Sequence, residues 1–194
     1  SATLGEAITP AMVTSYDIEA RDTVFLKSWH PNHAGIPMHQ AARATAAAPT
    51  YFEPAQVSWS GRDRPLIDGG VFLNSPVVSA YAEALKRFPG DEIHVLSLGT
   101  GELTRPISFE QAQDWGALGW VLPLIDCMFD GMAKAADYQM QLFLGDRYQR
   151  LQTTLDMASD DMDDTSPENM ANLERTAERL VNEQGDAMAR WLNR

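Results

Sequence analysis

The sequence has little cysteine and little positive charge. Cys127 is the single cysteine among 194 residues, so the chain cannot form an internal disulfide, and this scarcity is typical of a reducing compartment. Lysine and arginine together number 15 against 27 acidic residues, which gives a net charge of −12 at pH 7. Because an acidic surface repels phosphate backbones, we expect no nucleic-acid partner.

The sequence also lacks a long apolar run. The longest uncharged apolar stretch, 115–125, is far shorter than the roughly 20 residues of a membrane-spanning helix. No basic segment followed by an apolar one opens the chain as a signal peptide would. We therefore expect a cytoplasmic protein. Hydrophobic residues still make up 44% of the composition. Because a typical domain has roughly 150 residues, the length predicts one domain over 1–194.

Short β-prone runs alternate with segments of helical periodicity, and this order predicts an α/β fold with a largely parallel sheet. The apolar run 92–98 is typical of a parallel strand buried on both faces. Residues 61–64 are expected to form a turn, and Ser75 to cap the helix that follows it. The expected strands are 11–17, 23–28, 56–60, 65–67, 92–98 and 147–153, and the expected helices are 37–48, 76–88, 109–120, 124–144 and 167–191.

Motifs for nucleophilic or metal chemistry are present only in part. The run 95–99 departs from the G-x-S-x-G nucleophile elbow at its first glycine, so Ser97 is interpreted as a core strand residue. His30 and His33 are too close together for a zinc site without a third ligand, and we expect them to be solvent-exposed. The acidic segment 160–164 lacks the glycine and glutamate of a calcium loop. We expect no metal, no organic cofactor and no serine nucleophile in this chain.

Asp68 follows an expected strand and precedes Gly69 and Gly70. Sheets of α/β proteins place reactive groups just beyond the carboxyl ends of their strands, and glycines permit positive φ and close backbone approach. A carboxylate held there is able to act as a general base toward a hydroxyl group. Taken alone, however, Asp-Gly is a common turn dipeptide. Asp17, at the end of another expected strand, is assigned no role.

Three segments carry a family resemblance when they are read in order. They are 42–54 (ARATAAAPTYFEP), 66–76 (LIDGGVFLNSP) and 95–101 (VLSLGTG). This series resembles the C-terminal part of the patatin-like phospholipases, the serine lipid acyl hydrolases. The resemblance extends from near Thr9 to the acidic segment before the last helix, which is most of the chain.

The resemblance implies a three-layer α/β hydrolase fold with a mainly parallel sheet, of which 1–194 would be the C-terminal portion. It implies a Ser-Asp dyad without histidine, and only its aspartate maps here, onto Asp68. Gly69, Gly70 and Asn74 would form the supporting turn. The nucleophilic serine and a glycine-rich oxyanion loop would lie upstream, so this chain alone is expected to be inactive. We expect Asp68 at the C-terminal end of a strand, facing a cleft.

The implied substrate is a phospholipid or another acyl lipid, cleaved at its carboxylic ester without a cofactor. The alternative is a non-catalytic lipid-binding or protein-interaction module that lacks the nucleophile. The segment 115–125, with a tryptophan near each side of its apolar run, suits a lipid tail or a transient contact with a membrane surface. Burial of this segment against the sheet is the commoner fate of such runs, and the negative charge opposes attraction to anionic membranes.

Overall fold

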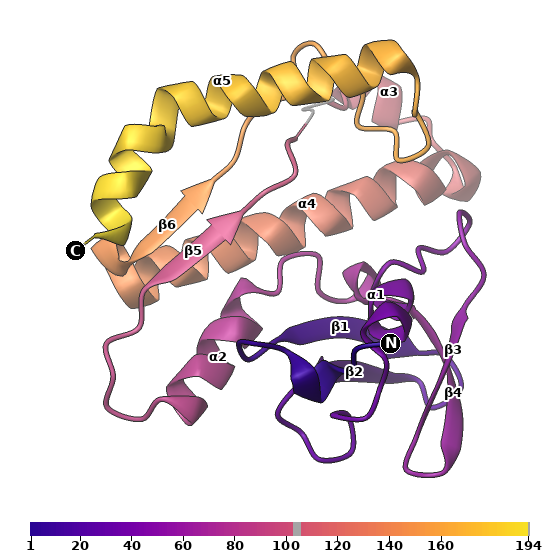
Figure 1. Cartoon of the computed structure of the whole chain (residues 1–194). Coiled ribbons are helices and arrows are strands. Elements are labelled where there is room, and N and C mark those ends of the chain that lie inside the picture. The colour runs from indigo at the N-terminus through magenta and orange to yellow at the C-terminus, as the bar shows by residue number, and fades with distance from the viewer. Residues whose placement is uncertain (103–105, 194) are drawn as a thin grey trace. The chain divides into compact units, whose positions relative to one another are not determined.

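A computed structural model describes residues 1–102 and 106–193, and it divides the chain into two compact units. The first unit consists of Ser1–Ile93 and Val121–Phe143, and the second of His94–Trp120 and Leu144–Arg194. Figure 1 shows strands and helices in both, so the predicted α/β composition is confirmed. No helix among the described residues is long and apolar enough to span a membrane.

The first unit contains a four-stranded antiparallel sheet with the strand order β2-β1-β4-β3. The turn between β3 and β4 is Ser60 and Gly61, both with positive φ (53° and 73°), as a tight hairpin turn requires. The predicted turn 61–64 is therefore too long, because Arg62 already belongs to β4. The bounds are β1 (Met12–Asp17), β2 (Asp22–Lys27), β3 (Ala55–Trp59) and β4 (Arg62–Asp68).

The second unit contains a two-stranded parallel sheet, in which β5 (Val95–Leu98) pairs with β6 (Tyr148–Leu151). Ser97 is 8% exposed, and its Oγ accepts a hydrogen bond of 2.9 Å from Nη1 of Arg150 on β6. The interpretation of Ser97 as a core strand residue is confirmed. In the described chain only this pair is parallel, so a mainly parallel sheet is not confirmed. Short turns join only antiparallel strands, whereas β5 and β6 are separated by a long helical connection.

The core of the first unit lies between the sheet and the helix α1 (Met38–Thr45). Leu26, Val57 and Leu66 on the strands are completely buried. Ala41 and Ala44 of α1 are buried in the same cluster, and their small side chains allow the helix to approach the sheet closely. The short helix η2 (Gly69–Val71) follows β4, and the helix α2 (Val77–Arg87) follows η2. Pro76, not the predicted Ser75, is the N-cap of α2.

The helix α4 (Ala117–Leu144) is continuous where two helices were predicted, and α3 (Phe109–Ala112) is a separate single turn. Pro123 lies inside α4. Its ring removes the hydrogen bond to residue 119 and crowds that carbonyl, but it lies only in the second turn of a 28-residue helix. The predicted break at 121–123 is therefore wrong, because a proline this near the start of a long helix does not end it.

The helix α5 (Pro167–Leu192) begins where Ser166 and Pro167 predicted, and Ser166 Oγ accepts from the N–H of Asn169. Its buried residues include Asn169, Thr176 and Trp191, whereas the apolar side chain of Met170 is 47% exposed. Asn169 is buried because its Oδ1 accepts from the N–H of Ser159, at 2.8 Å, in the preceding loop. Hydropathy alone does not indicate the burial of a polar side chain that accepts a hydrogen bond from a loop.

Candidate functional site

Asp68 is the last residue of β4, so its predicted position at the C-terminal end of a strand is confirmed. Its backbone N–H donates to the carbonyl of Ala47 at 3.0 Å. On the neighbouring strand β1 its partner is Ser15. Ser15 is completely buried, and its Oγ has no hydrogen-bond partner in the part of the chain that the structure describes. Because it is buried, Ser15 is not positioned to attack a substrate.

The carboxylate of Asp68 is held by one backbone hydrogen bond. Its Oδ1 accepts from the N–H of Gly70 at 2.7 Å, so that Asp68 caps η2. No residue between 1 and 102 or 106 and 193 donates a hydrogen bond to Oδ2. The side chain is half-buried. One oxygen is therefore fixed, and the other is able to accept a proton.

Gly69 allows the loop after β4 to pass against β1. A Cβ on Gly69 would lie 2.6 Å from the backbone carbonyl carbon of Thr14, far inside normal contact. Neither Gly69 nor Gly70 has a positive φ, so the predicted reason for this glycine pair is wrong in that respect. Close approach of two backbones is the feature that requires Gly69.

Asn74 connects the same loop to α4. Its Nδ2 donates to the carbonyl of Phe129 at 3.2 Å, and its Oδ1 would lie 3.8 Å from a Cβ on Gly70. The four predicted site residues therefore lie on one short loop. Asn74 links this loop to a helix that is distant in sequence.

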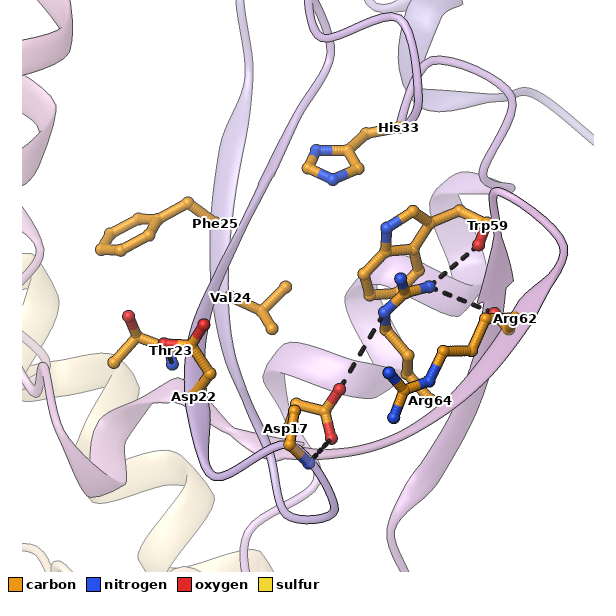
Figure 2. A pocket seen from close by; sticks show the side chains of 10 residues that line it. Asp17, Asp22, Thr23, Val24, Phe25, His33, Trp59, Arg62 and Arg64 are labelled. Atoms are coloured by element: carbon orange, nitrogen blue, oxygen red, sulfur yellow. Dashed lines mark hydrogen bonds and ion pairs between the residues drawn. The ribbon is translucent and has the colours of Figure 1, made fainter.

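A pocket of about 330 Å³ lies around the buried side chain of Asp17, at the end of β1 (Figure 2). Asp17 is 2% exposed. Its Oδ1 accepts from the N–H groups of Glu19 and Ala20 at 3.0 and 2.9 Å, and its Oδ2 lies 4.0 Å from Nε of Arg64. The sequence assigned Asp17 no role, yet it is a buried structural anion.

Arg64 and Trp59 form one wall of this pocket. The guanidinium carbon of Arg64 lies 3.8 Å from the centroid of the Trp59 ring, a close cation–π contact. Nη1 of Arg64 donates to the carbonyl of Trp59 at 2.9 Å. Figure 2 shows His33 beside the Trp59 ring, with centroids 5.5 Å apart, and Asp17 beside the Arg64 guanidinium. The charges of Asp17 and Arg64 already compensate each other.

His33 is half-buried, not exposed as predicted. Its Nδ1 accepts from the backbone N–H of Lys27 at 3.3 Å, which assigns the proton of the neutral ring to Nε2. Burial, together with repulsion from His30, Lys27 and Arg64, lowers the pKa of His33 to about 4. Trp59, whose ring contacts His33 with centroids 5.5 Å apart, and Arg64 are distant in sequence, so the local sequence does not indicate these contacts.

The lowered pKa predicts that acid destabilises the fold through His33. Between pH 6.5 and about 4 the unfolded chain binds a proton at His33 that the folded chain does not, so stability falls as the pH falls through this window. After solvent screening is discounted, we expect a loss of the order of 1 kcal/mol, or roughly 2–4 °C in melting temperature. Thermal unfolding of the wild type and His33→Gln at pH 7 and pH 4.5 measures it. An identical pH dependence in the two proteins would contradict the prediction.

Two further observations concern the access of Asp68 to a cleft and the grouping of possible metal ligands. Asp68 does not line the Asp17 pocket or the groove between α2 and α4 that is described below, so the prediction that its carboxylate faces a cleft is not confirmed. Among the described residues, no three His, Cys, Asp or Glu side chains are grouped to hold a metal ion.

Comparison with known proteins shows what the segment around the Asp68 loop is similar to. Residues 13–81 match the family model for the patatin-like phospholipases. This segment includes β4, all of β1 except Met12, and all four predicted site residues. The chain is similar to the patatin-like phospholipases.

The chain also matches curated relatives along most of its length. Patatin-2-Kuras 3 of Solanum tuberosum is 29% identical over 209 aligned residues, which cover 91% of this chain and 53% of that protein. Patatin-04/09 of the same species is 28% identical, with the same coverage. "Probable inactive patatin-3-Kuras 1", also of Solanum tuberosum, is 28% identical over 91% of this chain and 55% of its own length. The chain thus spans about half the length of these relatives.

In the segment 115–125, which contains Trp115 and Trp120, most side chains whose burial the structure describes are exposed. Leu118 is 93% exposed, Val121 52% and Leu124 49%. The expected burial of this segment is therefore wrong for the described chain. Trp115 and Trp120 instead pack against each other, with ring centroids 5.2 Å apart in an edge-to-face geometry.

Proposed function

We propose that residues 1–194 are the C-terminal part of one patatin-like domain that hydrolyses carboxylic esters of glycerolipids. In this proposal, upstream strands complete a three-layer fold with a mainly parallel sheet. The upstream segment also supplies a nucleophilic serine and a glycine-rich oxyanion loop. Asp68 is the base of the Ser-Asp dyad. The observation that carries the proposal is the half-buried carboxylate at the end of β4, anchored through Oδ1 with Oδ2 unoccupied.

The reaction assigned to Asp68 is proton transfer. Its carboxylate takes the proton of the serine hydroxyl as the serine oxygen bonds to the ester carbonyl carbon. The ester C–O bond then breaks, and the protonated Asp68 gives its proton to the departing alcohol. In the second half, Asp68 takes a proton from water, which attacks the acyl-enzyme, and returns it to the serine. The N–H of Gly70 holds Oδ1 in place throughout.

The substrate class follows from the family match, whose model is that of patatin-like phospholipases. We propose a phospholipid or another acyl lipid as substrate. The exposed apolar side chains of Leu118, Val121 and Leu124 suit a transient contact with a membrane surface. The single cysteine, which is free and exposed, suits a reducing compartment such as the cytoplasm.

A second candidate function is a non-catalytic lipid-binding or protein-interaction module. It is favoured by the relative whose name describes an inactive patatin, because the chain is about as similar to that protein as to the others. The upstream coding sequence separates the two functions. A G-x-S-x-G motif after an apolar strand supports the enzyme, and its absence supports the module.

We predict that the isolated chain is inactive and that the parent polypeptide is an esterase. The reason is that attack on an ester needs an activated nucleophile and donors for the oxyanion. Hydrolysis of a p-nitrophenyl ester and labelling by a fluorophosphonate probe should both be absent for 1–194 and present for the parent. Turnover by 1–194 with covalent labelling of one of its own serines would contradict the proposed division of the site.

A further inference from the structure

An apolar groove of about 280 Å³ runs between the loop after β4, the start of α2 and the middle of α4. All of its walls belong to the first unit. The apolar side chains that line it are Phe72, Leu73, Val78, Met132, Ala135 and Ala136.

The groove begins one turn after Asp68. The backbone N–H groups of Phe72 and Leu73 donate to the carbonyl of Gly69, at 3.1 and 2.9 Å. Because the chain turns in this way directly after the Asp68 loop, the side chains of Phe72 and Leu73 both line the groove. The hydrogen bond from Asn74 to the carbonyl of Phe129 holds the same loop on α4, which forms the opposite wall.

The chemistry of the walls indicates the kind of ligand. None of the lining residues is charged, and the three polar ones are Ser75, Ser79 and Gln139. A phosphate or ammonium headgroup would lose its hydration there without gaining a partner of opposite charge. Met132 has a flexible side chain that adapts to an apolar chain. The volume, about 280 Å³, lies near the lower end of the roughly 300–1,000 Å³ of small-molecule sites, so one acyl chain fits and a whole lipid does not.

We propose that this groove binds the acyl chain of the ester whose carbonyl group is presented to Asp68, and that its length sets the chain-length preference. The inference rests on the proposed function. Burying each methylene should raise kcat/KM by roughly fourfold, the equivalent of about 0.8 kcal/mol. This gain ends when the groove is full.

The test fills the groove from its exposed wall. Ala135 lines the groove yet is solvent-exposed, so Ala135→Phe introduces a ring without displacing core side chains. The matched control is Gln141→Phe, an exposed position on the same helix that does not line the groove. Both variants are made in the parent polypeptide, and kcat/KM is measured for p-nitrophenyl esters from acetate to palmitate. A melting curve for each variant verifies folding.

We expect Ala135→Phe to lower kcat/KM for long-chain esters at least about tenfold, the loss of two or more buried methylenes. Acetate and butyrate esters should be hydrolysed as by the wild type, and Gln141→Phe should match the wild type on all esters. An unchanged chain-length profile in Ala135→Phe would overturn the proposal. So would an equal loss on all esters in a folded protein.

A direct binding measurement tests the groove independently of the proposed hydrolytic function. Dodecanoate is titrated into the parent wild type and Ala135→Phe by calorimetry. If the wild type hydrolyses no ester but binds dodecanoate, and Ala135→Phe binds it at least about tenfold more weakly, the enzyme proposal fails while the acyl groove stands. Absence of dodecanoate binding in the wild type, or equal binding in the variant, overturns the groove.

Discussion

Asp68→Asn in the parent polypeptide is expected to lower kcat by roughly two to four orders of magnitude, the usual contribution of a general base. The amide oxygen of asparagine still accepts from the N–H of Gly70, as Oδ1 of Asp68 does. The amide cannot, however, take the proton of a serine hydroxyl. Initial rates on a long-chain ester measure the loss, and a melting curve shows whether the fold is kept.

The matched control for this substitution is Asp22→Asn. Asp22 is an exposed carboxylate on β2 of the same sheet, and its Oδ1 also accepts a backbone N–H, that of Thr23 at 2.8 Å. Asp17 is unsuitable as a control because its side chain is buried beside Arg64. Wild-type activity in Asp68→Asn, or the same loss in Asp22→Asn, would remove Asp68 from the mechanism.

Asp17→Ala is expected to destabilise the chain by about 3–5 kcal/mol, the usual cost of breaking a buried ion pair. The substitution removes the acceptor of two backbone N–H groups, those of Glu19 and Ala20. It also leaves Arg64, whose side chain is 19% exposed, without its carboxylate partner. At about 2–4 °C per kcal/mol for a chain of this size, the melting temperature should fall by roughly 10 °C, as circular dichroism can measure.

Two further variants identify the cause of that loss. Asp17→Asn keeps an oxygen for the two N–H groups but not the charge, so it should cost clearly less than Asp17→Ala. Asp22→Ala, at an exposed position, should stay within about 0.5 kcal/mol of the wild type. If Asp17→Ala unfolds at the wild-type temperature, the buried carboxylate does not stabilise the fold.

Local elements were predictable from the sequence where local chemistry decides them. The β-prone runs 11–17 and 23–28 form β1 and β2, and Ser166 and Pro167 begin α5 as predicted. Strand direction was not predictable in this way. It depends on pairing between segments that are distant in sequence, such as Tyr16 of β1 with Ile67 of β4. The alternation of strand and helix suggested parallel strands, but all three strand pairs of the larger sheet are antiparallel, and short turns join only two of them, β1–β2 and β3–β4.

The candidate site, too, was predictable where the local sequence determines it and not where contacts between distant segments do. The position of Asp68 follows from a short motif after an apolar strand, and the structure places it there. The contact of His33 with the ring of Trp59 and the pairing of Asp17 with Arg64 join segments that are distant in sequence. No local pattern indicates these contacts. The position of the Asp68 loop was therefore predictable from the sequence, whereas the pocket around Asp17 was not.

The close approach of Gly69 to β1 has a consequence for any mutational library of this loop. The atoms that a side chain at position 69 would meet include the backbone carbonyl carbon of Thr14, as well as its side chain. Shortening the side chain at position 14 therefore cannot create the missing space, because the obstructing backbone carbon is present in every residue. Second-site suppressors of a change at Gly69 should be absent from position 14. A screen that diversifies the loop recovers more folded clones when position 69 is left as glycine.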